Sequence, residues 1–350
     1  MIIQDQDTKL VIGLVDNGKH YLLIKQVLMK VYHVFVFQEH RPGCGLDFTP
    51  FEQIVTLLSV VRHKTLNPTI PIHLLTDLRS YEIFKSMGID KLYDKVEYDF
   101  FNDYPSDRIS NIFWASPKIW ATKKLKAPFM IMDMDLVLHK SYSYFHNYDF
   151  VGLHRESPTH YATPYNISIP NNFKWTFDEI QSFSKTFPIN GCLTYWGNND
   201  LKNSFVNRYF ELVFDNPGEL YISNFDEMRK FDYINQYPVQ LFAEQWLMAA
   251  KINEYKKTHP DLKWKCMLDI VYTMGGFISE KTETSKTEFY MDEAAYHLWG
   301  SKNYYYLEST DPKYISTKNM LINDGMYLLN QYNKKHLYID LYYEYINKLH

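Results

Sequence analysis

The sequence predicts an α/β fold in which helices cover both faces of a mainly parallel sheet. The first half of the chain alternates short apolar runs, typical of buried strands, with segments whose apolar residues recur at helical spacing. The chain has 350 residues, and 46% of them are hydrophobic, which is enough to bury a sizeable core. This alternation favours parallel βαβ units, and in such sheets ligands bind at the carboxyl ends of the strands.

The expected elements follow one another along the chain in this βαβα order. The apolar run at 128–138 is the strongest strand, and Pro117 must start or bend part of the helix that precedes it. The segment 155–190 has the polar character of a long excursion from the sheet. Strands are expected at 32–37, 71–77, 95–99, 128–138 and 189–197, and helices at 51–63, 79–88, 109–125, 199–214, 238–255, 318–332 and 337–349.

The bulk composition narrows the class of protein. The formal net charge of -4 gives no electrostatic reason to expect nucleic acid or an anionic membrane as partner. No stretch approaches the length of an apolar membrane span, and the first residues lack the features of a signal peptide. Three widely spaced cysteines, Cys44, Cys192 and Cys266, fit a reducing compartment better than a disulfide framework. We therefore expect a cytoplasmic protein with no membrane span.

Asp133 and Asp135 are the strongest indication of chemistry. They follow the apolar run FMIM, so the chain carries them from the interior of the sheet to its edge. Alternation along a continuing strand places both side chains on one face. Two unpaired carboxylates there repel each other, and Mg²⁺ or Mn²⁺ removes that penalty and can bridge a diphosphate. The alternative is an acidic strand end in which one aspartate caps the next turn.

A second group of residues lies late in the chain, in the segment YHLWGSK at 296–302. His297 can supply a nitrogen ligand, which favours Mn²⁺ over Mg²⁺. Gly300 allows the backbone to approach a phosphate, and Lys302 offers that phosphate a point charge. The alternative is that His297 is an ordinary core or surface histidine beside aromatic residues. It becomes a candidate metal ligand only in combination with the aspartate pair.

Together the two motifs resemble those of the GT-A glycosyltransferases, above all the glycogenin-type family 8 and its relatives. Those proteins pair Asp-x-Asp after an apolar strand with a late His-x-x-Gly-x-x-Lys. This chain has His-x-x-Gly-x-Lys and lacks the Pro-Trp that follows, which puts the role of Lys302 in doubt. The resemblance covers residues 30–302, and it implies a GT-A domain at 1–302 with a C-terminal helical extension at 303–350 packed on it.

The resemblance also implies roles for residues upstream and downstream of the aspartate pair. Lys118 lies at the spacing of a family lysine that contacts the donor, although it is equally an ordinary solvated helix lysine. Asp77 resembles an aspartate near the nucleotide, and the alternative is that it caps the helix beginning at Arg79. Asn190 and Gly191 lie where relatives place an amide or acid and a small residue against the transferred sugar, and Asn-Gly is also a strong turn signal.

Glu244 lies on an otherwise apolar face of the helix expected at 238–255. A carboxylate that enters an apolar pocket can steer the acceptor hydroxyl or act as a general base with a raised pKa. The alternative is a buried structural acid that is paired with an arginine or a lysine.

These expectations combine into a metal-dependent glycosyltransferase that uses a UDP-sugar and Mn²⁺ or Mg²⁺. The resemblance of the His297 motif to retaining enzymes implies retention, and Glu244 is the leading base if the enzyme inverts. The acceptor is a glycan, a protein or a small molecule, and the sequence leaves a homo-oligomer open. Two alternatives remain: a nucleotidyltransferase, for which Gly43–Gly45 is the candidate phosphate loop, and a non-catalytic module that binds a nucleotide-sugar.

Overall fold

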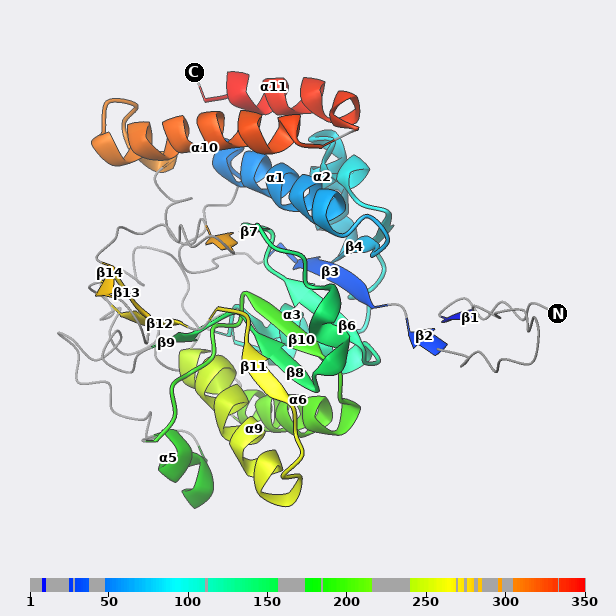
Figure 1. Ribbon diagram of the computed structural model, residues 1–350, viewed down its shortest axis with the longest axis vertical. Coiled ribbons are helices and arrows are strands. Elements are labelled where there is room, and N and C mark those ends of the chain that lie inside the picture. The colour runs from blue at the N-terminus through cyan, green and yellow to red at the C-terminus, as the bar shows by residue number, and fades with distance from the viewer. Residues whose placement is uncertain are drawn as a thin grey trace, which may run out of the picture.

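A computed structural model gives the architecture of the chain (Figure 1). It describes residues 8–10, 25–27, 29–37, 48–110, 113–156, 174–183, 185–215, 240–268, 270–273, 276–279, 283–284, 295–297, 305–332 and 334–349. For 8–10, 25–27 and the segments between 270 and 297, only the backbone is described.

A seven-stranded sheet forms the centre of the molecule, with the order β11-β8-β10-β6-β3-β4-β5. Strands β6, β3, β4 and β5 are parallel neighbours, β10 runs antiparallel to both β6 and β8, and β11 is parallel to β8. The mainly parallel α/β sheet predicted from the sequence is therefore confirmed. Its strands are β3 (Lys30–Phe35), β4 (Ile72–Thr76), β5 (Lys95–Glu97), β6 (Phe129–Met132), β8 (Phe150–Gly152), β10 (Leu193–Trp196) and β11 (Trp264–Cys266).

Helices cover both faces of this sheet, because alternate strand residues feed two separate cores. Val31, Leu74 and Met130 point into a core shared with α1, whereas Tyr32 and Ile131 point into a core shared with α6 and α9. Figure 1 shows the two helical layers on opposite sides of the sheet. The helices are α1 (Pro50–Leu66), α2 (Leu78–Ser86), α3 (Ser116–Lys124), α5 (Phe177–Phe183), α6 (Asn199–Phe214), α9 (Leu247–Thr258), α10 (Pro312–Asn330) and α11 (Ile339–Asn347).

Local sequence signals explain where several of these helices begin. Thr49 and Glu52 form a capping box at the start of α1, with Pro50 at its first position. Asn198 caps α6 in the same way, by accepting from two backbone N–H groups of its first turn. The helix expected at 109–125 begins only at Ser116, because Pro117 fits the first turn of a helix but not its interior.

Smaller sheets flank the central one. Strand β7 pairs antiparallel with β15, and β9 joins β12, β13 and β14 in a four-stranded sheet. Strand β1 (Thr8–Leu10) pairs antiparallel with β2 (Lys25–Val27). The other strands of the smaller sheets are β7 (Leu136–Leu138), β9 (Arg155–Glu156), β12 (Ile270–Thr273), β13 (Gly276–Ser279), β14 (Glu283–Thr284) and β15 (Ala295–His297).

The C-terminal helices α10 and α11 pack on α1 and share its core. Tyr342 and Tyr345 of α11 are almost completely buried. The Tyr345 hydroxyl donates to the Met87 carbonyl at 2.5 Å, and the Tyr314 hydroxyl donates to the Leu349 carbonyl at 2.8 Å. The tyrosine-rich end of the chain is thus fastened by phenol hydroxyls as well as by apolar contact.

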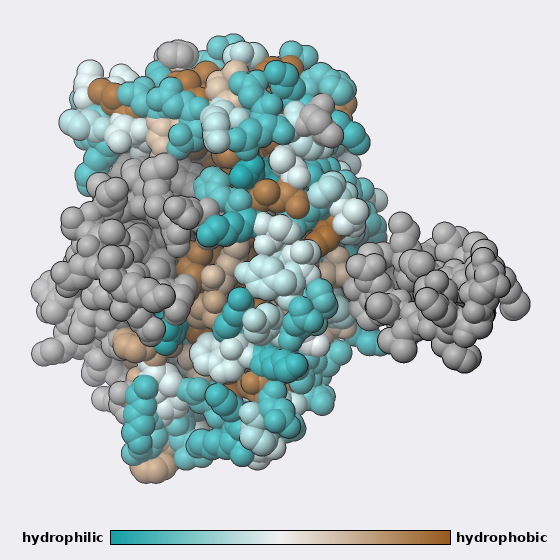
Figure 2. All heavy atoms as spheres, viewed as in Figure 1, coloured by the Kyte–Doolittle hydropathy of each residue, from teal (hydrophilic) through white to brown (hydrophobic). Residues whose placement is uncertain are grey.

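The outer surface of both helical layers is mostly hydrophilic in Figure 2, with hydrophobic residues scattered over it. In the C-terminal part, Tyr327 and Leu337 are exposed large side chains. None of the helices in the described residues combines the length and the apolar character needed to cross a membrane.

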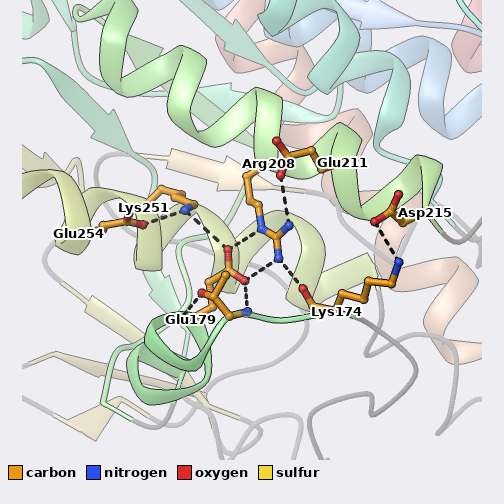
Figure 3. A network of polar contacts seen from close by, with 8 residues as sticks. Lys174, Glu179, Arg208, Glu211, Asp215, Lys251 and Glu254 are labelled. Carbon is orange, nitrogen blue, oxygen red and sulfur yellow. Dashed lines mark hydrogen bonds and ion pairs between the residues drawn. The ribbon is translucent and has the colours of Figure 1, made fainter.

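A buried ion cluster, which we call the Glu179 clamp, fastens α5 to the helices α6 and α9 (Figure 3). Glu179 of α5 accepts from Arg208 of α6 through both carboxylate oxygens, at 2.7 and 2.9 Å. Lys251 of α9 lies 3.6 Å from the same carboxylate. Glu179 also completes a capping box with Thr176 at the start of α5.

Candidate active site

The candidate site lies at the carboxyl ends of the parallel strands, as the fold class requires. Asp133 follows β6 directly, and Asp77 follows β4 on the same edge of the sheet. Strand β3 lies between β6 and β4, so strand spacing separates the two aspartates by about 10 Å. This edge also receives residues from α3, from the start of β10 and from the helix that precedes α9.

Asp133 and Asp135 do not lie on one continuous strand, so the predicted strand at 128–138 is wrong in this detail. It is two strands, β6 and β7, which belong to different sheets. A tight turn joins them, in which the Leu136 N–H donates to the Asp133 carbonyl at 3.1 Å. The two aspartates are therefore joined by a turn, and strand alternation does not place their side chains. The Asp133 side chain is 34% exposed, whereas Asp135 is 7% exposed.

Lys118 lies among three acceptors at this turn. Its Nζ is 3.1 Å from Asp133 Oδ1, 2.8 Å from the Gly191 carbonyl oxygen and 3.2 Å from Glu244 Oε1. Burial opposes the charge on the ammonium, but the fields of Asp133 and Glu244 outweigh it and raise the Lys118 pKa above its usual value. Lys118 is thus no solvated helix lysine, and the structure brings it together with the residues that the sequence singled out.

Glu244 lies in a π-helical turn, Phe242–Trp246, that runs directly into α9. The sequence predicted an ordinary helix there, and π-turns of this kind occur frequently at functional sites. The Glu244 side chain is 6% exposed, and its second oxygen accepts from Gln240 Nε2 at 3.0 Å. The contact of Glu244 Oε1 with Lys118 is an ion pair without the geometry of a hydrogen bond.

Asn190, Gly191 and Cys192 form a turn that leads into β10, and this turn faces the aspartates. The Asn190 side-chain oxygen accepts from the Cys192 N–H at 2.9 Å, and the Cys192 carbonyl accepts from the Asp133 N–H at 2.7 Å. A methyl group on Gly191 would lie 2.2 Å from Glu244 Oε1, so a side chain at this position would displace Glu244. Asn190 and Gly191 therefore form a turn, as one of the two interpretations of the Asn-Gly pair predicted. The same turn contacts Lys118 and Asp133 of the candidate site.

Asp77 caps α2, as one of its two predicted roles required. Its Oδ1 accepts from the Ser80 N–H at 3.1 Å, and Ser80 Oγ accepts in turn from the Phe37 N–H at 2.8 Å. The cap accounts for one oxygen of the carboxylate and leaves a nucleotide role untested.

The late motif is only partly described. His297 is the last residue of β15, and the strand register places it opposite Leu136, the residue that follows Asp135. The backbone of His297 therefore lies beside the aspartate turn, although its side chain is outside the described residues. Gly300 and Lys302 are also outside them. Within the described residues, no three histidine, cysteine, aspartate or glutamate side chains are close enough to hold a metal ion by themselves.

Two residues that the sequence did not single out support the aspartate turn from the core. Ser59 of α1 donates to the Leu136 carbonyl at 2.5 Å and lies 3.5 Å from His33 Nε2. Burial, together with the field of His63, lowers the pKa of His33 to about 3, although Asp135 opposes this shift. His33 is therefore a neutral imidazole. It lies inside the apolar run of β3, where neither spacing nor motif distinguishes it from a core residue.

A third residue that the sequence did not single out is Glu156 of β9, which is completely buried. Its Oε1 accepts from Asn190 Nδ2 at 2.5 Å, and its Oε2 has no hydrogen-bond partner among the described residues. Burial first, and then the field of Glu244, raise the pKa of Glu156 to about 8, although the hydrogen bond from Asn190 opposes them. The only sequence signal is its place just after the buried run at 150–153.

Comparison with known proteins gives distant structural likenesses only. No family model matches the chain, and no curated protein matches it. Among solved structures, PaToxG glycosyltransferase is 9% identical, with 65% of this chain and 69% of that chain covered at a TM-score of 0.35. The galactosyltransferase LgtC, solved with donor and acceptor sugar analogs, is 8% identical over 63% of this chain and 69% of its own, at a TM-score of 0.32.

A structure of a different enzyme class is similar to the same degree. CMP:2-keto-3-deoxy-manno-octonic acid synthetase, complexed with CTP, is 11% identical over 72% of this chain and 93% of that one, at a TM-score of 0.32. Because these likenesses are weak, the choice between functions depends on the residues of the candidate site.

Proposed function

We propose that this protein is a metal-dependent glycosyltransferase that moves a sugar from a nucleotide-sugar, most simply a UDP-sugar, to an acceptor. The observation that carries the proposal is the convergence of Asp133, Lys118, Glu244 and the Asn190–Cys192 turn at the carboxyl end of β6. A nucleotidyltransferase is the runner-up, and its candidate loop at Gly43–Gly45 lies outside the described residues.

The donor set fits a divalent cation of the Mg²⁺ or Mn²⁺ kind. Such ions bind through one or two carboxylates and complete their coordination with substrate phosphates and water. Asp133 and Asp135 would supply the carboxylates, and the position of the His297 backbone supports that residue as a nitrogen ligand. When bound, the cation would neutralise charge on the leaving diphosphate.

The other residues would orient the donor. Lys118 holds Asp133 and Glu244 in place through one ammonium group, and this charge would also favour an anionic donor at the same edge. Because Gly191 has no side chain, Glu244 packs directly against the Asn190–Cys192 turn, where the transferred sugar would lie. Asp77 would lie on the nucleotide side of the edge, with one oxygen occupied by its cap.

Retention of the anomeric configuration is part of the proposal. Glu244 contacts Lys118 through one oxygen and Gln240 through the other, so it is not placed as a free general base. This supports a reaction in which the acceptor attacks from the face of the departing diphosphate, without a strong enzymatic base. In such a reaction Glu244 would position Lys118 and the acceptor.

The test is UDP release from a panel of UDP-sugars with Mn²⁺, which compares the native chain with Asp135→Asn. We expect one donor to be hydrolysed or transferred, and Asp135→Asn to lower the rate at least roughly 100-fold while the fold survives. The matched control is Asp103→Asn, whose side chain is 64% exposed and forms an ion pair with Lys124. If no donor reacts and both variants bind nucleotide like the native chain, the aspartate pair is structural.

Thermal shift measurements separate the proposal from the runner-up. Stabilisation by UDP that requires Mn²⁺ supports a glycosyltransferase, because the ion would link the diphosphate to Asp133 and Asp135. Stabilisation by a nucleoside triphosphate, with no response to UDP, would favour a nucleotidyltransferase instead.

A further inference from the structure

Glu156 lies under the turn that carries two groups of the candidate site. It donates its own N–H to the Pro188 carbonyl at 2.8 Å, and the Asn190 N–H donates to the His154 carbonyl at 3.0 Å. These backbone bonds run on both sides of Glu156 and fix it against the start of the turn. Its side chain then reaches Asn190 Nδ2 at 2.5 Å.

A continuous set of hydrogen bonds leads from Glu156 to the site. The Asn190 side chain, held by Glu156, accepts from the Cys192 N–H and so closes the turn. The two carbonyls of this closed turn then point outward: Gly191 accepts from Lys118 at 2.8 Å, and Cys192 accepts from the Asp133 N–H at 2.7 Å. The positions of Lys118 and Asp133 therefore depend on the conformation of Asn190.

The charges around Glu156 disfavour its ionised form. Glu244 faces it from the π-helical turn, and the Cys192 thiol, whose pKa burial raises well above its usual value, faces it from the start of β10. His154 and Arg155 precede it in the chain, and Tyr272 of β12 lies opposite in the strand register. No cation pairs with Glu156 in the described part of the chain, because Lys118 is occupied by Asp133 and Glu244.

We propose that Glu156 is held as a neutral carboxylic acid and positions the Asn190–Cys192 turn beneath Lys118 and Asp133. The proton lies on Oε2, since Oε1 accepts from Asn190. Glu156 is a positioning residue, because it acts on the site only through Asn190. Its effect on turnover rests on the proposed function, whereas its protonation can be measured without any activity.

The first test is the pH dependence of stability in Glu156→Gln, an isosteric and permanently neutral variant. A native pKa of about 8 lies above the unfolded value of 4.5, so the native state binds the proton more tightly. The free energy of unfolding of the native chain therefore falls as pH rises through this window, and this loss levels off above it. Glutamine has no proton to lose, so the Tm of Glu156→Gln should gain on the native Tm between about pH 5 and pH 8.

The control is Glu82→Gln, which changes an exposed glutamate of α2 and gives the baseline for the same substitution. A Tm difference for Glu156→Gln that matches this baseline at every pH would overturn the proposal. Carbon-13 labelling of the glutamate carboxyls gives a second measurement on the unaltered chain. One carboxyl should titrate near pH 8, and the proposal is wrong if all glutamates have titrated by about pH 6.

The second test concerns positioning and uses the reactive donor. Glu156→Gln keeps an oxygen for Asn190, so it should retain UDP release at neutral pH. Glu156→Ala removes the support of Asn190 and should lower the rate roughly tenfold or more at every pH. Equal rates in all three proteins would contradict the positioning role. If no donor reacts at all, the proposed function fails, while the stability measurement still decides the protonation of Glu156.

Discussion

The Glu179 clamp and the group around Lys118, which we call the Lys118 cluster, are both buried ion clusters with opposite balances of charge. In the clamp, one carboxylate faces two cations, Arg208 and Lys251 (Figure 3). In the Lys118 cluster, one ammonium faces two carboxylates, Asp133 and Glu244. In both clusters the charged residues come from separate helices, strands or turns. The two clusters therefore differ in the sign of their excess charge and not in how they are assembled.

The two clusters also differ in how completely their carboxylate oxygens are hydrogen-bonded. Both oxygens of Glu179 are bonded, through a bidentate arginine and a backbone N–H, and its side chain is 2% exposed. In the Lys118 cluster, Glu244 Oε1 has an ion pair but no hydrogen bond within the described part of the chain, and one oxygen of neighbouring Glu156 has no hydrogen-bond partner there. A satisfied cluster serves to hold helices together, whereas a cluster with excess negative charge is suited to accept a further cation.

The largest expected effect on stability comes from removing the arginine of the clamp. Arg208→Met leaves Glu179 buried with Lys251 at 3.6 Å, and breaking such a pair costs about 3–5 kcal/mol of unfolding free energy. We expect chemical denaturation to show this loss while nucleotide binding by the folded protein stays unchanged. Arg108→Met is the matched control, because Arg108 is exposed and, in the described part of the chain, loses only its contact with the Phe214 ring, so stability should change by about 1 kcal/mol or less. A loss of nucleotide affinity in Arg208→Met would show that the clamp also shapes the site.

A smaller expected effect is the pH dependence of the stability that the Glu179 clamp contributes. Burial opposes ionisation of Glu179, but the hydrogen bonds from Arg208 and Thr176 outweigh it and lower the pKa of Glu179. Its stabilising contribution is therefore present above the unfolded pKa and lost as pH falls through the folded one. The gap in unfolding free energy between the native chain and Glu179→Gln should be full at pH 7 and close below about pH 4. A gap that stays constant down to pH 3 would mean that the carboxylate charge is not what stabilises the clamp.

Much of the fold could be predicted because its signals are local. The helix α1 combines helical spacing of apolar residues with a capping box, and β4 ends at an aspartate that caps α2. The aspartate pair and Lys118 could be picked out because motif order and spacing are properties of the chain itself. Parallel topology then brings the carboxyl ends of β6, β3 and β4 to one edge, where Asp133 and Asp77 lie, and Lys118 reaches this edge from α3.

The rest of the site depends on contacts between distant segments, which local patterns do not encode. Glu156 becomes a neighbour of Asn190 only because β9 is held beside Ile189 by an isolated bridge. The turn between β6 and β7 exists because β7 leaves the central sheet to pair with β15, so strand alternation was the wrong guide at Asp135. The π-turn at Glu244 likewise has no sequence signature that separates it from an ordinary apolar helix.

The smallest expected effect on stability, with a clear effect on function, comes from Gly191→Ala. The backbone of Gly191 does not need a positive φ, so alanine is tolerated there except for its contacts. Its methyl group would lie 2.2 Å from Glu244 Oε1 and 2.9 Å from Glu244 Cδ. Glu244 can turn away because the clash is with a flexible side chain, but it then gives up its buried contacts, so we expect a cost of about 1–3 kcal/mol.

Turning Glu244 away separates it from Lys118, so donor turnover should fall roughly tenfold or more in Gly191→Ala. Chemical denaturation and UDP release measure the two effects separately. A double-mutant cycle with Glu244→Ala identifies the cause, since Gly191→Ala should have no further effect once the glutamate is gone. If the two substitutions lower turnover additively, the methyl group acts directly on the donor, and the Lys118 cluster does not depend on the contact between Gly191 and Glu244.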